Sequence, residues 1–531
     1  MARHFRDTQF GHLVRFLSSN KLFRYPDEMD PSLREKYLQR DENGEPHGAS
    51  TQDLSEKQVE DGIDVHLVDW YGPDDPENPQ NWPDSWKLLI GFQICILNFS
   101  VYIGSSIYVA GAPDIMEDFG VSQTVATLGL SLYTAGYGIG PMLWSPMSEL
   151  PKLGRNAIYL YTLLAFVLLQ LPTGFATNMP MFLIFRFATG FCGSPSLSTG
   201  GATLMDIYDP ARILYGICIY SSFGVLGPVF GPIIGGFVAP AKGWRWTIWV
   251  FTWLDACVLV LLFFLLPETS AANILLRRAK RLRKATGDER LRSQSEIDAA
   301  HHTMRDDLIV LSRAFTLAFS EPIVFFMDLY SALLYGVLFL WFESFPLVFG
   351  GIYGFDSGAQ GLVFLGIFVG AVITVPLFLL WVRYHIVPKL TDPAFKPEML
   401  LPPMFLGAAA LPICLFWYGW SSRESIHWIM PIIGSSFFTV GVVTLFNPVF
   451  NYLGMAYPAS PASIFAGNAL FRASFGASFP LFAPALFHRL GIGPGNSLLG
   501  GIAICFIPIP FIFYYHGERI RHMSKNARHD I

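Results

Sequence analysis

Long apolar blocks separated by short polar turns make up most of the chain, and charged residues gather outside them. Residues 1–85 are rich in charge and proline, residues 267–322 are strongly charged, and residues 516–531 form a short polar tail. A helix that crosses the hydrocarbon core of a bilayer needs about 20 apolar residues. Six blocks of that length lie on each side of the charged centre, so the pattern predicts twelve membrane-spanning helices.

The predicted spans form two sets of six. In the first half they are residues 86–110, 123–143, 156–176, 180–203, 213–238 and 244–266; in the second half they are residues 323–349, 358–381, 402–420, 426–448, 461–487 and 496–515. We therefore expect an all-α membrane protein with two six-helix bundles, residues 86–266 and 323–515, joined by a cytosolic connector at residues 267–322. Residues 1–85 and 516–531 are expected to be cytosolic. Such a pair of bundles is typical of transporters, with the substrate near the midplane between the halves.

Composition supports a membrane protein and excludes several kinds of site. The chain has 531 residues, of which 52% are hydrophobic and 15% charged, where soluble domains have roughly a quarter. The six cysteines are isolated, without a C-x-x-C pair, so neither a disulfide framework nor a metal site is expected. No phosphate-binding G-x-x-x-x-G-K-[ST] loop occurs, so an ion gradient is a better energy source than ATP, and no cofactor is expected.

The distribution of Lys and Arg predicts that both termini are cytosolic. Arg155, the run "RRAKRLRK" at 277–284 and the basic tail fall on one side, whereas the first outer loop carries Asp114 and Glu117; basic residues favour the inner side. The run is interpreted as an inner-surface charge run in contact with the membrane, not as a nucleic-acid site. The early stretch "FRDTQFGHLVRFLSSNKLFRY" groups its apolar residues on one helical face, which is typical of a helix on the inner leaflet. A partly disordered tail with a transient helix is the alternative.

Several strings, in this order along the chain, make the interpretation specific: "WYGPDDPENPQNW", "NFSVYIGSSIY", "VATLGLSLYTAGYGIGPMLWSPMSELPKLGRN", "RFATGFCGSPSLSTGGATLMDIY", "FGVLGPVFGPIIGGF", "GWRWTIWVFTWL", "LPETS", "YGVLFLWFESFPLVF" and "FRASFGASFPLF". With them the chain resembles the fungal drug:proton antiporters of the major facilitator superfamily, in the twelve-span group that includes fluconazole, benomyl and cercosporin resistance transporters. The resemblance covers the chain from about Trp70 to the end of the twelfth span. It implies export of hydrophobic toxic compounds, such as azole antifungals, other xenobiotics or an endogenous toxin, in exchange for protons at the plasma membrane, by a protein that functions as a monomer.

The loop after the second span, "GPMLWSPMSELPKLGRN", matches the cytoplasmic-loop motif of the superfamily. Gly140 and Pro141 are expected to break the helix near its inner end. Glu149 and Arg155, which follows Gly154, are expected to pair with partners or helix ends as the halves move. The superfamily usually has Asp and two basic residues here, so this chain departs from the pattern, and ordinary inner-side charges are the alternative interpretation.

Arg186 lies within the fourth span, in "MFLIFRFATGF". A charge at that depth costs about 2.5 kcal/mol or more on insertion scales, so Arg186 needs a partner or a wet cavity. The resemblance implies that this is the proton-coupling arginine, and the hypothesis is that it holds a nearby acid in its charged form. A structural arginine satisfied by backbone carbonyls is the alternative.

Few acids are available as proton carriers within the spans. Glu343 in "LFLWFESFP" is preferred because its string matches the family, and Asp255 in "TWLDACVLV" is ranked second. Carboxyl groups buried without a partner are well suited to exchanging protons near neutral pH. Asp328 is expected to face cytosolic water, and Asp206 is expected to be a helix-end residue.

A drug site should be apolar and aromatic with few polar anchors. The seventh and eleventh spans supply such side chains, and the candidate substrate-binding residues are Tyr330, Tyr335, Phe339, Trp341, Asn468, Phe471, Arg472 and Phe475. Aromatic residues in membrane helices also serve for packing and as interfacial belts, which is the alternative for each of them.

The fifth span carries the antiporter motif of the family. Its glycines recur at spacings of three and four and should form one small-residue stripe that admits another helix closely; the candidate gating residues are Gly224, Gly227, Pro228, Gly231, Pro232, Gly235 and Gly236. The eighth span offers a complement from the other half: Gly358, Gly361, Gly366 and Gly370. The resemblance implies a seal between the halves in the outer half of the membrane, and plain packing is the alternative.

Other functions fit the sequence less well than drug export does. A polyamine or small-metabolite transporter of the same fold would want clustered membrane carboxylates, and the sequence offers only scattered ones. A membrane enzyme would need a catalytic motif, but His385, His427 and His488 are single. A transport-dead receptor remains an alternative.

Overall fold

The computed structural model describes residues 5–30, 32–33, 65–300, 312, 314–393, 395–458, 461–524 and 526–528. In these ranges, ten helical segments are long and apolar enough to cross a membrane. Two more complete the predicted set: α8 with 27 residues, and α10 followed by α11 with 15 and 13 residues. The described helices therefore agree with twelve spans.

The first half is built from α6 (Asp84–Ser106), α8 (Gln123–Glu149), α9 (Gly154–Gly174), α10 (Met179–Gly193) with α11 (Pro195–Ile207), α12 (Pro210–Lys242) and α13 (Trp244–Leu265). The second half is built from α17 (Pro322–Phe345), α18 (Ser357–Val363) with α19 (Leu365–Trp381), α20 (Pro403–Ser421), α21 (Ile429–Ser436) with α22 (Phe438–Ala456), α23 (Pro461–Leu490) and α24 (Ile492–Phe506) with α25 (Pro508–Met523). Short turns complete them: α7 (Ala112–Phe119), the 3-10 turns η1 (Pro79–Asn81), η2 (Val109–Gly111), η5 (Val387–Lys389) and η6 (Pro397–Leu400), and the π-helical η3 (Pro346–Gly350) and η4 (Val382–Ile386).

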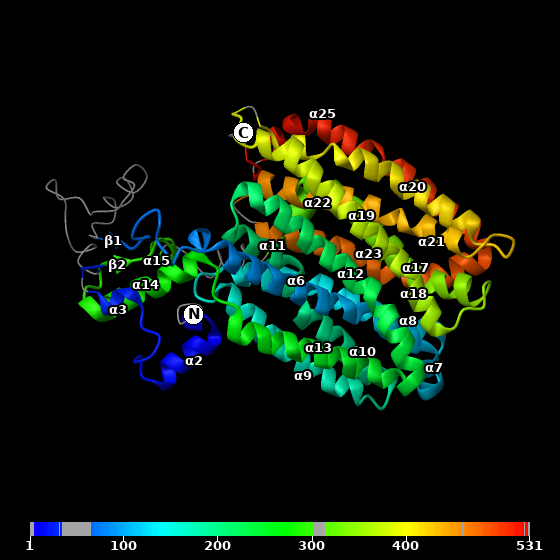
Figure 1. Cartoon of the computed structure of the whole chain (residues 1–531), viewed down its shortest axis with the longest axis horizontal. Coiled ribbons are helices and arrows are strands. Elements are labelled where there is room, and N and C mark those ends of the chain that lie inside the picture. Colours follow the sequence, from blue (N-terminus) through cyan, green and yellow to red (C-terminus); the bar gives the residue numbers. More distant parts are fainter. Residues whose placement is uncertain are drawn as a thin grey trace.

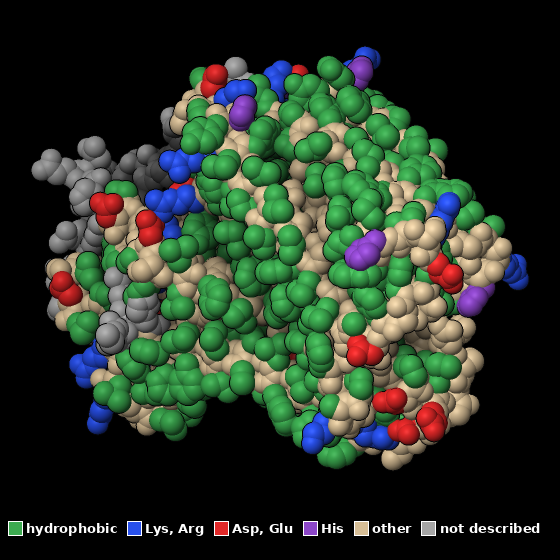
Figure 2. Space-filling view, turned by 45° about the vertical axis from the view of Figure 1, so that its right-hand side comes forward, with side chains coloured by type: hydrophobic (Ala, Val, Ile, Leu, Met, Phe, Trp, Pro, Cys, Tyr) green, Lys and Arg blue, Asp and Glu red, His purple; other side chains and the backbone are tan. Residues whose placement is uncertain are grey.

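The two halves lie side by side, and polar segments cap one end of the helical body (Figure 1). We call this the connector end, because α14 (Ala271–Thr286) and α15 (Gln294–Ala300) lie there, as do both termini; α7 and α18 lie at the opposite, far end. Hydrophobic side chains dominate the face drawn in Figure 2, and charged ones lie mainly towards its edges. Exposed residues such as Trp253, Val372 and Leu377 suit contact with lipid tails.

Segments from the chain start and the connector fold together at the connector end. They comprise α2 (Gln9–Leu17), α3 (Pro26–Met29), β1 (His66–Leu67), α14 and β2 (Leu291–Arg292). The two strands pair in parallel, with His66 opposite Leu291. A cluster of ion pairs joins these segments, and we call it the clasp.

The clasp corrects the prediction for the basic run. Arg278 is fully buried and donates to Asp75 at 2.7 Å and to Glu77 at 3.0 Å. Arg281 donates to Asp27 at 3.0 Å and to Glu77 at 3.2 Å. The inner-surface interpretation is therefore wrong for Arg278 and Arg281, because the segments before the first span supply carboxylates that take these side chains out of solvent.

Replacing Arg278 with methionine should release the clasp. Asp75 would lose its buried arginine partner, and Glu77 would keep only its other arginines; loss of one partner of a buried pair typically costs about 3–5 kcal/mol. Hydrogen exchange of the amides at residues 65–82, measured on the full-length protein in detergent, should become faster. Lys280→Met, an exposed neighbour on α14, is the matched control and should leave exchange unchanged. Wild-type protection in Arg278→Met would contradict the assigned role.

The same experiment has a defined pH dependence. Burial raises the pKa of the Asp75 carboxyl, but the hydrogen bonds and charge of Arg278 lower it by more, so it lies below its ordinary value of 3.8. A lowered folded pKa stabilises the clasp above about pH 4, and this contribution is lost as the pH falls through the folded value. Protection in the wild type should therefore persist at pH 7 and decline on acidification.

Helix α2 packs beside the connector end of the sixth span. The Phe10 ring lies 6.3 Å from Phe263 and 4.9 Å from Phe264, measured between centroids. Phe16 and Leu17 are 81% and 72% exposed. These exposed apolar side chains continue the lipid-facing surface of α13, so contact of α2 with the leaflet stays a prediction.

The last helix continues past residue 515, where the twelfth span was predicted to end. It reaches Met523 because ion pairs extend it: Glu518 accepts from Lys396 at 2.7 Å, and Arg521 donates to Glu398 at 3.1 Å. The first part of the predicted tail is therefore helix packed on η6.

Candidate functional site

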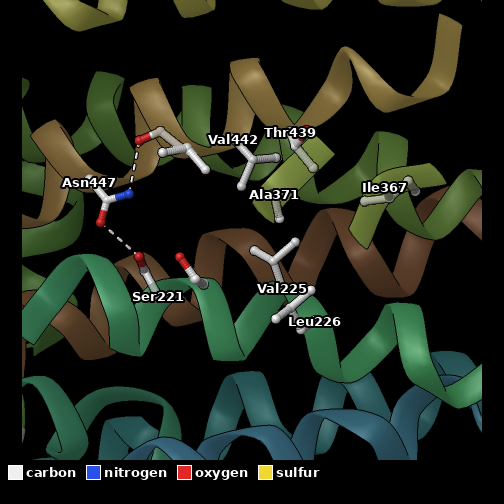
Figure 3. A pocket seen from close by; sticks show the side chains of 10 residues that line it. Ser221, Val225, Leu226, Ile367, Ala371, Thr439, Val442 and Asn447 are labelled. Atoms are coloured by element: carbon white, nitrogen blue, oxygen red, sulfur yellow. Dashed lines mark hydrogen bonds between the residues drawn. The ribbon is translucent and has the colours of Figure 1, made fainter. Parts of the chain in front are cut away.

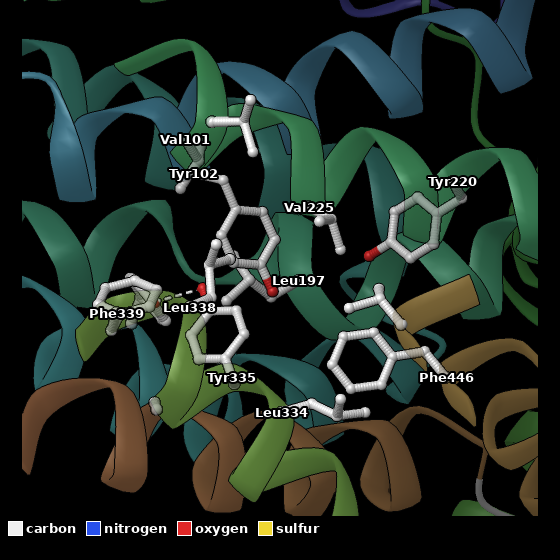
Figure 4. Packing of buried hydrophobic residues seen from close by; sticks show 14 of the residues in the cluster. Val101, Tyr102, Leu197, Tyr220, Val225, Leu334, Tyr335, Leu338, Phe339 and Phe446 are labelled. Carbon is white, nitrogen blue, oxygen red and sulfur yellow. Dashed lines mark hydrogen bonds between the residues drawn. The ribbon is translucent and has the colours of Figure 1, made fainter. Parts of the chain in front are cut away.

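Tyrosines from both halves meet at the centre of the molecule. The Tyr102 ring on α6 lies 5.6 Å from Tyr137 on α8 and 6.2 Å from Tyr335 on α17. The hydroxyls of Tyr137 and Tyr335 are 2.6 Å apart and form a hydrogen bond between the halves. Figure 4 shows Tyr102 and Tyr335 beside each other, with Tyr220 of α12 and Phe446 of α22 nearby. We call these five residues the aromatic centre.

Arg472 on α23 lies against the aromatic centre. Its Nη1 donates to the Tyr102 hydroxyl at 3.1 Å, across the two halves. Its guanidinium carbon lies 5.5 Å from the Tyr335 ring, 5.7 Å from Phe446 and 5.5 Å from Phe450. Aromatic faces with one cation among them can accept apolar, ring-bearing ligands.

The structure sorts the predicted substrate-binding residues into two groups. Tyr335 and Arg472 lie at the centre, and Phe339 packs on Tyr335 at 4.7 Å. The other aromatic residues face elsewhere: Tyr330 packs on Phe506, Trp341 on Tyr418 and Phe438, Phe471 on Phe319 and Phe325, and Phe475 on Phe479. Asn468 lies on the Arg472 face of α23, one turn earlier, and bonds Asp328. The two predicted helices, α17 and α23, are correct. The spacing of their aromatic residues did not predict which face of each helix turns towards the aromatic centre.

Sequence reasoning missed the contribution of the first half to this centre. Tyr102 lies in the quoted string "NFSVYIGSSIY" and Tyr137 in "GLSLYTAGYG", so the signal was present as aromatic residues at predicted mid-span depth. Tyr220 and Phe446 lie in none of the quoted motif strings. All four are buried.

Nearby, a small pocket lies between α12, α19 and the tenth span (Figure 3). Its volume is about 10 Å³, and its lining includes Val225, Ala371 and Val442. At its edge Ser221 donates to the Oδ1 of Asn447 at 2.8 Å, again across the halves. Drug sites have roughly 300–1,000 Å³, so a drug could occupy this place only after the halves part.

At the connector end, Glu149 joins the halves. Its Oε1 accepts from the backbone N–H of Ala462, in the first turn of α23, at 3.2 Å; a carboxylate at a helix N-terminus is electrostatically favourable. Arg155 instead pairs with Asp206 at 3.1 Å and donates to Ser148 at 2.8 Å. Asp206, expected to be only a helix-end residue, is thus the charge partner of Arg155.

Two glycines of the loop motif have distinct roles. Gly154 has a φ of +75°, and a Cβ there would lie 2.4 Å from Glu268 Oε2; Glu268 accepts from the backbone N–H of Arg155 at 2.9 Å. The expected break at Gly140 and Pro141 is wrong, because α8 runs unbroken through both. A Cβ on Gly140 would lie 2.6 Å from the Phe191 carbonyl oxygen, so this glycine permits close packing on α10.

Glu343 joins the halves near the far end. Its Oε2 accepts from Gln123 Nε2 at 3.1 Å, and its Oε1 lies 3.1 Å from the Thr127 hydroxyl. That hydroxyl also lies 3.0 Å from the Gln123 carbonyl oxygen. Because Thr127 has one hydrogen, it can donate to only one of these oxygens at a time.

Arg186 is buried without an ion pair in the described part of the chain. Its Nη2 donates to the Gly104 carbonyl at 2.8 Å and its Nε to the Gly129 carbonyl at 3.2 Å. Its guanidinium lies over the rings of Tyr108 and Tyr133, at 4.7 and 4.4 Å. The hypothesis of a directly held acid is contradicted in this arrangement, since carbonyls and aromatic faces meet the charge.

The two remaining membrane acids are fully buried. Asp255 accepts from Gln170 Nε2 at 3.1 Å, and Asp328 accepts from Asn468 Nδ2 at 2.8 Å. The expectation that Asp328 faces cytosolic water is wrong, because α23 covers it: a Cβ on Gly467 would lie 3.6 Å from its Oδ2.

The glycine stripe of α12 packs within the first half. A Cβ on Gly224, Gly227, Gly231 or Gly235 would lie 2.9, 2.6, 2.0 or 2.1 Å from atoms of α6 or of Ile107 just after it. Of the motif glycines, Gly236 alone would place a Cβ against the other half, 2.5 Å from the Ser357 carbonyl oxygen. The predicted meeting of the whole stripe with the second half is therefore wrong.

The eighth-span glycines divide in the same way. A Cβ on Gly361 would lie 2.5 Å from the Pro232 carbonyl oxygen, and one on Gly358 would lie 2.9 Å from Phe237, both on α12. Gly366 and Gly370 instead pack on Ile432 and Thr439 of their own half. The glycines of one stripe therefore have different neighbours, and only some of them face the other half.

The prolines of α12 are accommodated by α6. Pro232 has no N–H, so it cannot donate to the carbonyl of Pro228 one turn earlier. Ser106 Oγ donates to that carbonyl at 2.9 Å instead. Neighbouring hydroxyls commonly satisfy carbonyls freed by proline in membrane helices.

Comparison with known proteins agrees with this architecture. Residues 94–480 match the family model described as Major Facilitator Superfamily. The cycloheximide resistance protein of Candida maltosa is 37% identical over 551 residues, covering 99% of this chain and 100% of that protein. Fluconazole resistance protein 1 of Saccharomyces cerevisiae is 41% identical over 479 residues, covering 89% of this chain and 87% of that protein.

The fold is also found among solved structures. A proton:xylose symporter of the same superfamily superposes with a TM-score of 0.58 at 14% identity, covering 82% of this chain and 96% of that one. The structure has two six-helix halves with a closed centre between them, and the family model matches most of the chain. This protein therefore belongs to the major facilitator superfamily of transporters.

Proposed function

We propose that this protein is a proton-coupled exporter of hydrophobic toxic compounds, with azole antifungals, other xenobiotics or an endogenous toxin as substrates. The aromatic centre with Arg472 carries the proposal, because both halves supply its rings and its hydrogen bonds must break when they part. Relatives named for cycloheximide and fluconazole resistance support this substrate class.

The connector end is assigned to the cytosol and the far end to the outside, at the plasma membrane. The basic run at 277–284 lies on α14 at the connector end, and the first far-end loop carries Asp114 and Glu117, in agreement with the positive-inside rule. Drug enters between the halves after the Glu149 contact opens. It leaves when the contacts of Glu343 and Gly236 open. One chain contains the whole path, so a monomer suffices.

Glu343 is proposed as the principal proton carrier. If Thr127 donates to its own helix, only a proton on Glu343 Oε1 can make the contact between Oε1 and the Thr127 hydroxyl a hydrogen bond. In that arrangement protonated Glu343 closes the far end, and loss of its proton removes this hydrogen bond while Gln123 Nε2 still donates to Oε2.

Arg186 and Asp255 are proposed to tune this exchange through tyrosines. Arg186 lies over the rings of Tyr108 and Tyr133, so a movement of either ring changes the surroundings of its charge.

The test is azole efflux from reconstituted vesicles under an imposed pH gradient. Wild-type protein should move labelled fluconazole only with the gradient. Tyr335→Ala should weaken its export about tenfold, since aromatic contacts contribute about 0.5–1.5 kcal/mol beyond area burial. Trp253→Ala, which removes a half-exposed aromatic side chain from the lipid-facing surface, is the control and should export normally. Absence of gradient-dependent movement of every drug tested would overturn the proposal.

A further inference from the structure

Asp328 forms a buried group with Asn468 and Arg472 that the predicted proton path does not use. Asp328 lies in the second turn of α17, between the connector end and the aromatic centre, and is fully buried. Its Oδ1 accepts from Asn468, and its Oδ2 has no hydrogen-bond partner among the residues that the structure describes. An ionised carboxylate left half-satisfied at such a place is costly, whereas a protonated one is not.

Arg472 stands one helical turn beyond Asn468 on α23 and therefore on the same face. Its Nη1 reaches away to Tyr102 of the first half, and its Nε has no partner. Arg472 and Asp328 form no ion pair in the described part of the chain, although Asp328 bonds Asn468, one turn before Arg472. One buried cation and one buried acid of the same half thus lie on either side of Asn468 without pairing, while the cation bonds the other half.

No other charged group competes for Asp328 in the described residues. From α22, Tyr452 bonds Glu398 and Tyr457 bonds Glu321. From α25, Arg521 pairs with Glu398 and Glu518 with Lys396. The other titratable side chains of α25 are Tyr514, Tyr515, His516, Arg519 and His522, Tyr330 lies on α17 itself, and α24 carries no charge. Arg472 is the cation of α23 that lies one turn from Asn468, the residue bonded to Asp328.

We propose that Asp328 is a second proton-binding residue and that its ionisation draws Arg472 away from Tyr102. With Asp328 protonated, Arg472 holds Tyr102 and the halves stay joined at the aromatic centre, as in this structure. When the proton leaves Oδ2 for water, the carboxylate pairs with Arg472 and the bond to Tyr102 breaks. No covalent bond other than O–H changes. The inference rests on the proposed proton-coupled export and names a second residue that couples it.

The test measures drug binding and drug counterflow against pH with purified, reconstituted protein and labelled fluconazole. In Asp328→Asn, which imitates the protonated acid, counterflow should fall about tenfold and lose most of its pH dependence. Binding should stay within about twofold of wild type, because the aromatic centre is intact. Asp328→Glu keeps a carboxyl group and should retain a pH-dependent counterflow with a displaced midpoint. Asp114→Asn, an exposed far-end acid, is the control.

Tyr102→Phe provides an independent arm, since it removes only the acceptor hydroxyl. Its counterflow should be faster than that of wild type at low pH, where the hydrogen bond from Arg472 to Tyr102 would otherwise hold the halves together. Its counterflow should also vary less with pH. Wild-type pH profiles in both Asp328→Asn and Tyr102→Phe would overturn the inference while leaving export intact. Failure of wild-type protein to move drug under any gradient would instead overturn the proposed function and this inference with it.

Discussion

Gly236→Leu abolishes drug export while the protein still folds and reaches the membrane: this is the expected result at the far-end contact. A Cβ at Gly236 would lie 2.5 Å from the Ser357 carbonyl oxygen and 3.4 Å from Gly358 Cα, both in α18 of the second half. Overpacking costs about 1–3 kcal/mol, and a cost of that size on the closed far end alone shifts the equilibrium about 5- to 150-fold. Export rate and cell-surface protein are the two measurements.

The preceding residue supplies the matched control. A Cβ at Gly235 would lie 2.1 Å from the Ile107 carbonyl oxygen within the first half, a contact present in every state of the transport cycle. Gly235→Leu should therefore lower the amount of folded protein at the surface rather than the activity of each molecule. Equal loss of surface protein in both variants would show that Gly236 is a packing residue and not part of the seal.

Arg186→Ala should also eliminate export. Hydrogen bonds to charged groups contribute about 1.5–3 kcal/mol each, and Arg186 makes two of them, to Gly104 of α6 and Gly129 of α8. Arg186→Lys should recover little, because an ammonium group lacks the planar fork that reaches two carbonyls and stacks on two rings. Gradient-driven export and drug binding to purified protein are to be measured together.

The two measurements separate coupling from structure. Retained drug binding with lost export would assign Arg186 to proton coupling. Loss of both binding and export would show that Arg186 mainly stabilises the packing of α10 against α6 and α8. Arg245→Ala, which removes a half-exposed arginine at the far end, is the control for lost positive charge. Full export by Arg186→Ala would refute either role.

Apolar length and periodicity were sufficient to predict the fold. The predicted second span, residues 123–143, lies inside α8, and the predicted ninth, residues 402–420, differs from α20 by one residue at each end. The twelfth was predicted too short, since Glu518 and Arg521 extend the helix through ion pairs with residues distant in sequence. Hydropathy predicts which residues contact lipid. It does not predict where a helix is extended by ion pairs with a charged segment distant in sequence.

The candidate site was only partly predictable, for a related reason. Spacing gives the face on which a side chain lies, as with the stripe ending at Gly235, but not the neighbour that covers it. Asp328 was assigned to water because its depth was judged from the chain alone, whereas Gly467 and Asn468 of a distant helix enclose it. Arg278 was assigned to the membrane because Asp75, its partner, lies far away in sequence.

Helix α12 packs along one side against α6 of its own half and contacts the second half with its other side. Its contacts with α6, including the bond from Ser106 to Pro228, bind the two helices into one rigid arm. Along this arm Ser221 and Gly236 touch the second half at points about 22 Å apart, at 1.5 Å per residue. A tilt of about 10° around Gly236 then carries Ser221 roughly 4 Å over that length. A displacement of that size breaks the 2.8 Å hydrogen bond from Ser221 to Asn447. A small rotation of α12 about Gly236 is therefore enough to separate the two halves at this contact.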